Sequence, residues 1–469
     1  MLTKNVRLMK DIGGLILTPM LIMLLGVAAN AQKSPAFPLK VSASGRYLAD
    51  QHNVPFLIAG DSPQGLMGRL TEAQAEEYFA DRQALGFNTV GWVDVVCAGS
   101  DYPENTMATT PDGIRPFTGF VTGGSDHAHY DITKPNEAYF KRLDHIVTIA
   151  AKHEIVVFLD PMETIGWLST LRNNGPAAAY AYGQYLGTRY KKYYNVAWLL
   201  GNDFYNWRVG SDDSLVLAVA KGIKDNAPRQ IQSIELNPPT SSSFDDSAWI
   251  PFISINGTYT YSPTYIEMEH SYNQTPTAPT YLMEAHYDLE AVGSPPDFGS
   301  PSVLRRQEYW TMLSGGAGQF YGNSYTWSFK SGWQNNLDTP GARQLSLWKK
   351  LFTSLPWQDL IPDQDNKIVA VGGGSYGDLN VSVSKSNYCT AARTKDGSLV
   401  AVYVPDSPSI TINMSALRAP ALAKWFDPTD GTYTDAAASR LANSGGRQFV
   451  RPGTNHDGDS DWVLLLTVK

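Results

Sequence analysis

The sequence predicts an α/β protein, a (β/α)8 TIM barrel followed by a small C-terminal β-sandwich. From Val54 to Leu355, short apolar runs that end in polar residues alternate with helical patterns, and eight such alternations are typical of this barrel. After Pro356 the helical periodicity stops, and short strands separated by Gly, Asp and Pro follow. A chain of 469 residues also exceeds what one hydrophobic core usually supports. We therefore expect a catalytic barrel domain over 32–356 and a sandwich domain over 357–469.

Residues 1–31 have the pattern of a signal peptide. A stretch with lysine and arginine precedes an apolar run over 13–28, and the sequence Ala-Asn-Ala at 29–31 supplies a small-x-small cleavage site. The competing interpretation is an uncleaved membrane anchor, because the apolar run approaches the length that spans a bilayer. The position of the cleavage site directly after the run favours processing before Gln32. We expect a periplasmic or extracellular protein without stable membrane insertion after cleavage.

The composition excludes some classes of protein and leaves others open. A net charge of −8 with 17% charged residues provides no basic patch for nucleic acid. The 12 Trp and 25 Tyr residues fit either core packing or stacking against the apolar faces of sugars, and composition alone does not choose between them. Two cysteines, Cys97 and Cys389, are too few for a disulfide framework, so we expect buried free thiols. The oligomeric state is left open.

The barrel elements follow from their periodicity. Apolar runs of strand length predict the eight barrel strands, at 54–59, 87–96, 155–159, 196–200, 230–236, 253–259, 279–283 and 319–321. Helical spacing of apolar residues predicts the helices between them, at 70–85, 137–153, 180–194, 214–226, 302–313 and 345–355. In the first helix, Thr71 and Gln74 have the spacing of a capping box, and Gly86 ends the helix.

Two further regions lack helical periodicity. The connection 97–131 is rich in Gly, Pro, Thr and Asp and is too long for an ordinary loop, so we expect a mobile part of the substrate cleft. In the C-terminal region, apolar segments bounded by turn residues predict strands, at 368–371, 379–383, 399–404, 409–412, 423–426 and 462–468. The sequence Asp-Pro-Thr-Asp-Gly at 427–431 predicts a hairpin turn.

Two of the predicted barrel strands end in a carboxylate. The run 196–200 leads into Gly201, Asn202 and Asp203, and the run 279–283 leads into Glu284. Because active sites of these barrels form at the carboxyl ends of the strands, both side chains should reach the same rim. An Asp or Glu more often caps a helix or forms an ion pair. The position of these two residues directly after a buried strand favours a catalytic role instead. Two facing carboxyl groups are what glycosidic bond hydrolysis requires, so we predict Asp203 and Glu284 as the catalytic pair.

Other residues near the strand ends are candidates for substrate binding. Asn202 could hold a sugar 2-hydroxyl beside Asp203, and Asp61 and Asp160, which follow the first and third strands, could accept sugar hydroxyls or cap loops. Polar or aromatic residues a few positions past a strand should line the same site: Tyr205, Trp207, His286 and Trp327.

Several of these motifs together resemble the apiosidase-like glycoside hydrolases, glycoside hydrolase family 140. The resemblance rests on the segments 57–62, 70–73, 78–82, 86–88, 201–203, the strand ending in Glu284, 315–323 with Trp327, and in the tail 425–428 and 431–433. It implies a (β/α)8 barrel in which Asp203 is the general acid/base, with a raised pKa, and Glu284 is the ionised nucleophile of a retaining mechanism. It also implies a substrate of the pectin type, an apiose-containing linkage of a rhamnogalacturonan.

The chain differs from the family pattern in one loop, and we do not adopt the binding function in the name of its tail domain. Where the family usually carries a Thr-Ala-Trp-like segment, this chain has Ser62-Pro63-Gln64-Gly65, so an aromatic platform is absent and the sugar could differ. The tail resembles a β-domain labelled as collagen-binding, and we expect a module that stiffens the barrel rather than one that binds collagen.

Alternatives from other classes remain open at this point. A non-catalytic carbohydrate-binding barrel would not require carboxylates on both the fourth and the seventh strand. A metal-dependent barrel hydrolase would need clustered ligands, whereas the histidines are scattered and only His127 and His129 have ligand-like spacing. A barrel glycosidase acting on another sugar is the third alternative. We expect no metal and no cofactor, and an oligosaccharide or polysaccharide as the partner.

The export prediction can be checked directly. N-terminal sequencing of the mature protein should begin at Gln32, because the basic stretch, the apolar run and the cleavage site occur in the order that signal peptidase requires. A mature protein that still begins with Met1 would contradict it.

Overall fold

The computed structural model describes residues 34–96, 105–237, 240–290 and 299–468. Parallel strands form the barrel: β4 (Ile58–Asp61), β5 (Thr89–Asp94), β6 (Val156–Asp160), β7 (Val196–Phe204), β8 (Gln232–Leu236), β10 (Asn256–Thr260), β11 (Thr280–Glu284) and β12 (Gly318–Tyr321). The ladder runs from β8 through β4 to β10, and a short β9 (Thr240–Ser242) adds antiparallel to β10. The main-chain N–H of Ser254 donates to the carbonyl of Gln232 at 2.8 Å and links the two ends. The predicted fold class is confirmed.

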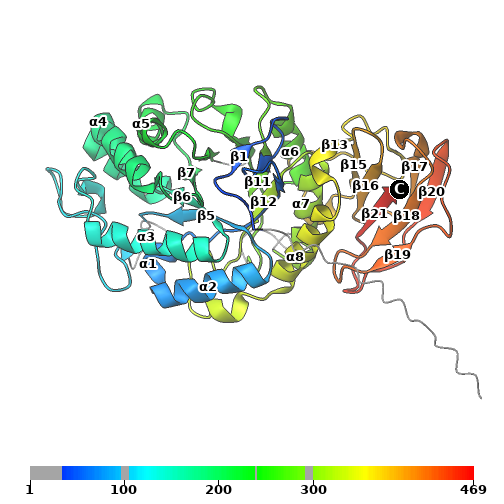
Figure 1. The fold of residues 1–469 in the computed structure, drawn as a ribbon, viewed down its shortest axis with the longest axis horizontal. Coiled ribbons are helices and arrows are strands. Elements are labelled where there is room, and N and C mark those ends of the chain that lie inside the picture. The colour runs from blue at the N-terminus through cyan, green and yellow to red at the C-terminus, as the bar shows by residue number, and fades with distance from the viewer. Residues whose placement is uncertain (1–33, 97–104, 238–239, 291–298, 469) are drawn as a thin grey trace, which may run out of the picture. The chain divides into compact units, whose positions relative to one another are not determined.

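Helices surround these strands (Figure 1). They are α1 (Leu66–Arg69), α2 (Glu72–Ala84), α3 (Glu137–Lys152), α4 (Thr164–Tyr190), α5 (Gly210–Asn226), α6 (Thr264–Asn273), α7 (Pro301–Leu313) and α8 (Pro340–Thr353). The capping box of α2 forms as predicted between Thr71 and Gln74. Helix α4 begins at Thr164, whereas the sequence predicted a start at 180. A kink at Gly175, with φ of 76°, followed by Pro176 interrupts the helical spacing of apolar residues, so the first half of the helix was not predicted.

The barrel interior is filled by side chains, as expected for this fold. The ring of Phe320, on β12, lies between β4 and β5 and packs against Trp92 and Phe158. A Cβ atom at Gly60 would lie 2.2 Å from the Phe320 ring, and one at Gly91 would lie 2.4 Å from it. A side chain at either position would overlap the Phe320 ring, so both residues have to be glycine. The packed ring closes the barrel interior below the carboxyl ends of the strands.

The described part of the long connection is packed rather than loose. Tyr130 and Phe117 are buried, and the Tyr130 ring stacks on Trp167 of α4 at 5.9 Å between centroids. This packing of 105–131 was not predicted, because the connection was expected only to be a mobile part of the cleft. Its aromatic residues are irregularly spaced, so no period in the sequence shows their burial. Residues 97–104, including Cys97, lie outside the described residues, whereas Cys389 is a buried free thiol, as predicted.

The C-terminal region forms two antiparallel sheets that enclose a core of their own. The first contains β13 (Leu360–Pro362), β15 (Thr390–Thr394), β16 (Leu399–Val404), β21 (Trp462–Thr467), β18 (Leu422–Phe426) and β19 (Tyr433–Asp435). The second contains β14 (Val369–Val371), β17 (Ser409–Asn413) and β20 (Gly446–Val450). The strand predicted at 379–383 is wrong, because the Asp378 carboxylate accepts the N–H of Asn380 and turns the chain there.

Near the N-terminus of the described chain, a small antiparallel sheet precedes the barrel. It consists of β1 (Lys40–Val41), β2 (Leu48–Ala49) and β3 (Pro55–Phe56). The single strand predicted at 54–59 is therefore two: β3 in this sheet and β4 in the barrel. Within the described residues, no helix combines the length and the apolar character needed to cross a bilayer.

The barrel and the C-terminal sheets share one hydrophobic core and belong to one compact unit over 35–469. Helix α7 contributes Arg305, which is 1% exposed and donates to both carboxylate oxygens of Asp461 at 2.8 Å. The hydroxyl of Tyr403, on β16, donates to the same carboxylate at 3.1 Å. Because Asp461 is also buried, this ion pair joins the two parts without competition from water.

We predict that Asp461→Ala lowers the free energy of unfolding by about 3–5 kcal/mol, because it leaves the buried guanidinium of Arg305 without its main partner. Denaturant unfolding monitored by tryptophan fluorescence measures this. The matched control is Asp338→Ala, which removes an exposed two-bond pair with Arg343 and should leave the midpoint unchanged. Equal effects of the two substitutions would show that the Asp461 pair does not join the two parts.

Candidate active site

The end of β7 has an unusual backbone at the residues predicted for catalysis. Gly201, Asn202 and Asp203 have φ values of 110°, 53° and 51°, in the left-handed region. The register against β8 shifts between Leu200 and Phe204, as in a β-bulge that redirects side chains. A non-glycine residue in this region costs about 1–3 kcal/mol and persists only when its surroundings hold it. Here the Thr164 hydroxyl lies 2.5 Å from the carbonyl oxygen of Gly201 and 2.9 Å from that of Asn202.

Glu284 ends β11 and is held by two tyrosines. Its carboxylate accepts hydrogen bonds from the Tyr261 hydroxyl at 3.0 Å and from the Tyr287 hydroxyl at 2.9 Å. The amide of Gln64 donates to the Tyr287 oxygen at 3.2 Å. Burial, and then the nearby charge of Asp203, raise the pKa of Glu284 to about 8, although both tyrosine hydrogen bonds oppose the rise. The site therefore favours the protonated form of Glu284 more than a solvent-exposed position would.

A third carboxylate, that of Glu235 on β8, lies beneath this pair. Glu235 is 0% exposed, and its Oε2 accepts the main-chain N–H of Asp203 at 3.1 Å. Asp203, Glu235 and Glu284 each present an oxygen, and these three atoms all lie within 4.8 Å of one another. Burial, followed by the charges of Glu284 and Asp203, raises the pKa of Glu235 well above its usual range. The three groups cannot all carry a charge at neutral pH.

A cavity of about 200 Å³ opens above these carboxylates. Of the predicted site residues, the structure brings together Asp203, Glu284, Asn202 and Trp327 around it. The remaining lining residues are Gln64, Tyr261, Tyr287, Glu290 and Ser324. They come from the loops after β4, β7, β10, β11 and β12, so the cavity lies at the carboxyl ends of the strands, where barrel active sites form.

Three predicted aromatic or polar residues lie outside this cavity. Tyr205 is 60% exposed and lines a neighbouring cavity of about 280 Å³ together with Asn206. Trp207 packs into the main core, under the guanidinium of Arg208. His286 stands behind Tyr261, with 5.0 Å between ring centroids, and its Nδ1 lies 3.2 Å from a carboxylate oxygen of Glu290. His286 therefore supports a lining residue without lining the cavity.

The two aspartates predicted to accept sugar hydroxyls are both fully buried. The carboxylate of Asp61 pairs with Arg82 at 3.2 Å and accepts the Tyr78 hydroxyl at 2.7 Å, so it is committed to the core between β4 and α2. Asp160, at the end of β6, accepts the N–H of Met162, and burial raises its pKa to about 8. Neither lines the cavity: Asp61 is held in the core by Arg82 and Tyr78, whereas Asp160 lies close enough to Glu235 for its charge to act there.

The sequence reasoning missed several residues of the site. Tyr261 directly follows β10 and Tyr287 lies three positions past β11, so the rule that located Asp203 would also have found them. Glu235 differs, because it lies inside the strand sequence Gln-Ser-Ile-Glu-Leu, where a polar residue argues against a buried strand. Gln64 lies in the loop that departs from the family pattern.

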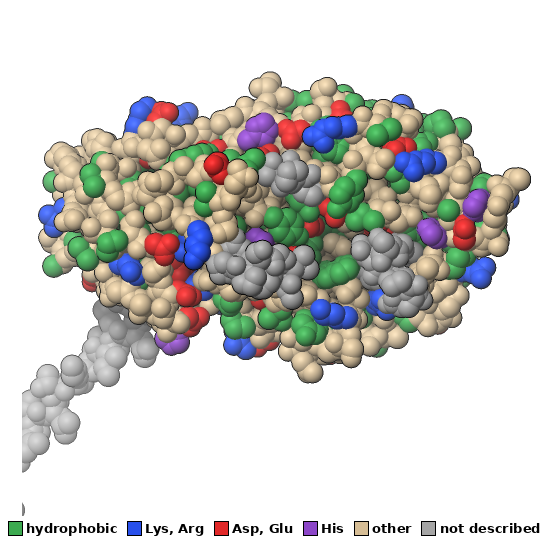
Figure 2. Space-filling model, turned by 180° about the vertical axis from the view of Figure 1, so that it is seen from behind, with side chains coloured by type: hydrophobic (Ala, Val, Ile, Leu, Met, Phe, Trp, Pro, Cys, Tyr) green, Lys and Arg blue, Asp and Glu red, His purple; other side chains and the backbone are tan. Residues whose placement is uncertain are grey.

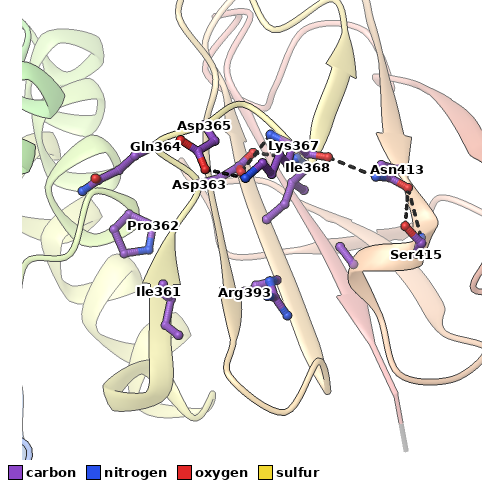
Figure 3. Close-up of a pocket in the computed structure, with 11 residues that line it drawn as sticks. Ile361, Pro362, Asp363, Gln364, Asp365, Lys367, Ile368, Arg393, Asn413 and Ser415 are labelled. Atoms are coloured by element: carbon purple, nitrogen blue, oxygen red, sulfur yellow. Dashed lines mark hydrogen bonds and ion pairs between the residues drawn. The ribbon is translucent and has the colours of Figure 1, made fainter.

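A larger cavity, of about 410 Å³, lies in the C-terminal region (Figure 3). The carboxylate of Asp363 is occupied by the main-chain N–H groups of Lys367 and Ile368, and Lys367 pairs with Asp365. The described residues that line this cavity include no aromatic ring on which a sugar could stack. On the face in Figure 2, Lys and Arg side chains of the described residues are scattered among acidic ones rather than gathered in one patch.

Two groups of described residues could place three ligand atoms around a metal ion. One is the set of Asp203, Glu235 and Glu284. The other, Asp245 with Glu267 and His270, lies near the surface, where His270 Nε2 lies 2.9 Å from an Asp245 oxygen. His127 and His129 belong to neither group: His127 contacts the carbonyl of Gly166, and His129 contacts Asp126.

A (β/α)8 barrel with two carboxylates at the ends of the fourth and seventh strands defines a class, the barrel glycoside hydrolases. The family model described as "Apiosidase-like, catalytic domain" matches residues 42–359, more than half of the chain. The chain belongs to this apiosidase-like family and is a glycoside hydrolase. A second model, described as "Putative collagen-binding domain of a collagenase", matches 379–467.

Solved structures agree in fold. One described as a glycoside hydrolase has a TM-score of 0.76 and 20% identity, with 92% of this chain and 97% of that chain covered. A glycoside hydrolase family 5 protein from Bacteroides vulgatus has a TM-score of 0.75 and 20% identity, with 92% and 93% covered. At this identity the likeness concerns the fold. A comparison with curated protein sequences found no match.

We predict that Tyr287→Phe raises the pKa of Glu284 further, because the Tyr287 hydrogen bond stabilises the ionised carboxylate and its loss favours the protonated form. The pH titration of the Glu284 carboxyl carbon in ¹³C-glutamate-labelled protein measures this, with Glu284→Gln to assign the signal. Tyr139→Phe is the control, since the Tyr139 hydroxyl donates to the carbonyl of Val95, away from Glu284. A lowered or unchanged pKa in Tyr287→Phe would contradict the geometry.

Proposed function

We propose that this chain is an exported, retaining glycosidase that cleaves an apiose-containing linkage in a pectin of the rhamnogalacturonan type. The observation that carries the retaining mechanism is the separation of the two carboxylates, since oxygens of Asp203 and Glu284 lie within 4.8 Å. Retaining enzymes keep their carboxyl groups about 5–5.5 Å apart, whereas inverting enzymes need about 6.5–9.5 Å to admit a water molecule. The short separation supports direct attack by one carboxylate.

The roles of the pair follow from their surroundings. Glu284 is fixed by two phenol hydroxyls, which suits a nucleophile that must hold one geometry and become ionised. Asp203 lies on the strained bulge and is less buried, so its side chain can exchange a proton with the leaving oxygen and then with water. Because burial and mutual repulsion oppose two charges, the pair holds one proton near neutral pH. The productive form carries it on Asp203.

The cycle then has two steps. The Glu284 carboxylate attacks the anomeric carbon while protonated Asp203 gives its proton to the departing oxygen, which leaves a glycosyl–enzyme ester. Asp203, now ionised, takes a proton from water, and the resulting attack releases the sugar and frees Glu284. The Asn202 amide lies beside Asp203 in the cavity and is placed to donate to a substrate hydroxyl. Trp327 lines the cavity with Tyr261 and Tyr287 and is the tryptophan among them.

The choice of sugar rests on the family, whose description names apiosidase-like activity. The loop at Ser62-Pro63-Gln64-Gly65 lacks the aromatic residue of the family pattern, and it places the Gln64 amide in the cavity instead. A glycosidase of the same mechanism that removes another sugar is therefore the second candidate. Export is proposed from the pattern at residues 1–31.

The reaction and its stereochemistry can be tested together. Purified protein should release a single sugar from rhamnogalacturonan fractions, and ¹H NMR of the first product should show the anomeric configuration of the substrate, because two displacements restore it. Release of apiose supports the sugar assignment, whereas release of another sugar supports the second candidate. An inverted product would exclude Glu284 as the nucleophile.

Substitutions separate the two roles. Glu284→Gln should abolish turnover without changing the thermal midpoint, since it removes the nucleophile but keeps the side-chain shape. Asp203→Asn should lose about 10²–10⁴-fold on the natural substrate and much less on an aryl glycoside, whose leaving group needs no proton. An equal loss on both substrates would contradict a general-acid role for Asp203.

Trp327→Ala should mainly raise KM, because an aromatic face binds the ground state and the transition state alike. An unchanged KM and kcat would make Trp327 a packing residue.

A further inference from the structure

Glu235 is the buried carboxyl of the site that the proposed cycle does not use. It lies at the end of β8, is 0% exposed, and is within 4.8 Å of Asp203 and Glu284 by its nearest oxygens. Its Oε2 accepts the N–H of Asp203, while its buried Oε1 meets no hydrogen-bond partner within the part of the chain that the structure describes. A buried, unpartnered oxygen destabilises the fold, and more so if it is charged, so an oxygen left in this state calls for an explanation.

Among the described residues, the charged groups that act on Glu235 are all acidic. Titratable groups that act on it or respond to its charge are Asp160 on β6, Asp203 on β7, Tyr259 on β10, Tyr281 and Glu284 on β11, and Tyr287 beyond β11. All of these are acids. An ionised Glu235 would therefore be a buried anion next to two catalytic carboxylates, which is the most costly arrangement for a charge in a protein.

We propose that Glu235 is a positioning residue that stays protonated through the reaction: one carboxyl oxygen fixes the backbone of Asp203, and its proton removes the charge that would otherwise repel the catalytic pair. This inference rests on the proposed function. The neutral carboxyl keeps its Oε2 as an acceptor for the Asp203 N–H and gives Oε1 a proton. It thereby holds the left-handed bulge in place and leaves one proton for Asp203 and Glu284 to share.

The first test compares two substitutions. Glu235→Gln has the shape of the protonated acid and keeps a carbonyl acceptor for the Asp203 N–H, so kcat/KM should fall by no more than about threefold. Glu235→Ala leaves that N–H without a partner and frees the bulge, and kcat should fall by about 10²-fold, the size of effect expected when a catalytic group shifts by about 1 Å. Rescue of the Ala defect by Gln separates positioning from chemistry. A Gln variant as inactive as Glu284→Gln would make Glu235 a catalytic acid or base and overturn the proposal.

The second test uses pH. If Glu235 is neutral, Glu235→Gln removes no charge, so the acid limb of kcat/KM, which reports ionisation of the free catalytic pair, stays in place. If Glu235 is ionised, the substitution removes a repelling anion, the pKa of Glu284 falls, and the acid limb moves to lower pH. A shift of that kind would overturn the proposal.

The third test needs no activity and so separates this inference from the proposed function. Infrared spectra of wild-type protein at pH 7 should contain a protonated carboxyl band that is lost in Glu235→Gln. The matched control is Glu308→Gln, the same substitution at a fully buried glutamate on α7, which should leave the carboxyl band assigned to Glu235 in place. A difference spectrum showing an ionised carboxylate at 235 would overturn the proposal, even if the enzyme proved active on the expected substrate.

Discussion

The rest of the structure depends on the burial of acidic side chains at the carboxyl ends of the barrel strands. Asp203, Glu235 and Glu284 lie within one small volume, and the described charged residues that act on Glu235 are all acidic. In water such a cluster would ionise and separate. Inside the barrel the backbone of the strands holds it together, and the pKa values of Glu235 and Glu284 rise instead. Burying these acids destabilises the fold, so packing elsewhere has to offset that free energy.

That packing is visible in two places. Under the rim, Phe320 fills the space that Gly60 and Gly91 leave, which gives the strand ends a rigid floor. On one side of the barrel, α7 and α8 share a core with the C-terminal sheet, and Arg305 closes it through Asp461. A strained bulge such as 201–203 persists only when its surroundings determine its conformation, and these contacts supply rigid surroundings. A stiffening role for the C-terminal region agrees with this arrangement.

Much of the fold was predictable because several barrel strands, such as β6 and β7, are buried on both faces and mostly apolar. Asp203 and Glu284 stood out because they interrupt such runs at a strand end. Glu235 gave no comparable signal, since its strand is polar at several positions and its importance depends on neighbours from other strands. Asp61 was wrongly predicted to bind substrate because it lies at a strand end, as catalytic residues do. Its carboxylate instead forms an ion pair with Arg82 on the next helix. Whether an acidic residue at a strand end lines the site or pairs within the core depends on residues distant in the sequence. A single sequence does not identify those partners.

The loop after β4 connects substrate choice with the chemistry. In the sequence, this loop differs from the family pattern because residues 62–65 include no aromatic residue. In the structure the same loop supplies Gln64, whose amide holds the Tyr287 hydroxyl, which in turn holds Glu284. The next residue, Gly65, donates its N–H to the carbonyl of Trp327 at 2.7 Å and so links the loop to the aromatic face of the cavity. A substitution at Gln64 would therefore change both the lining of the cavity and the hydrogen bonds that lower the pKa of Glu284.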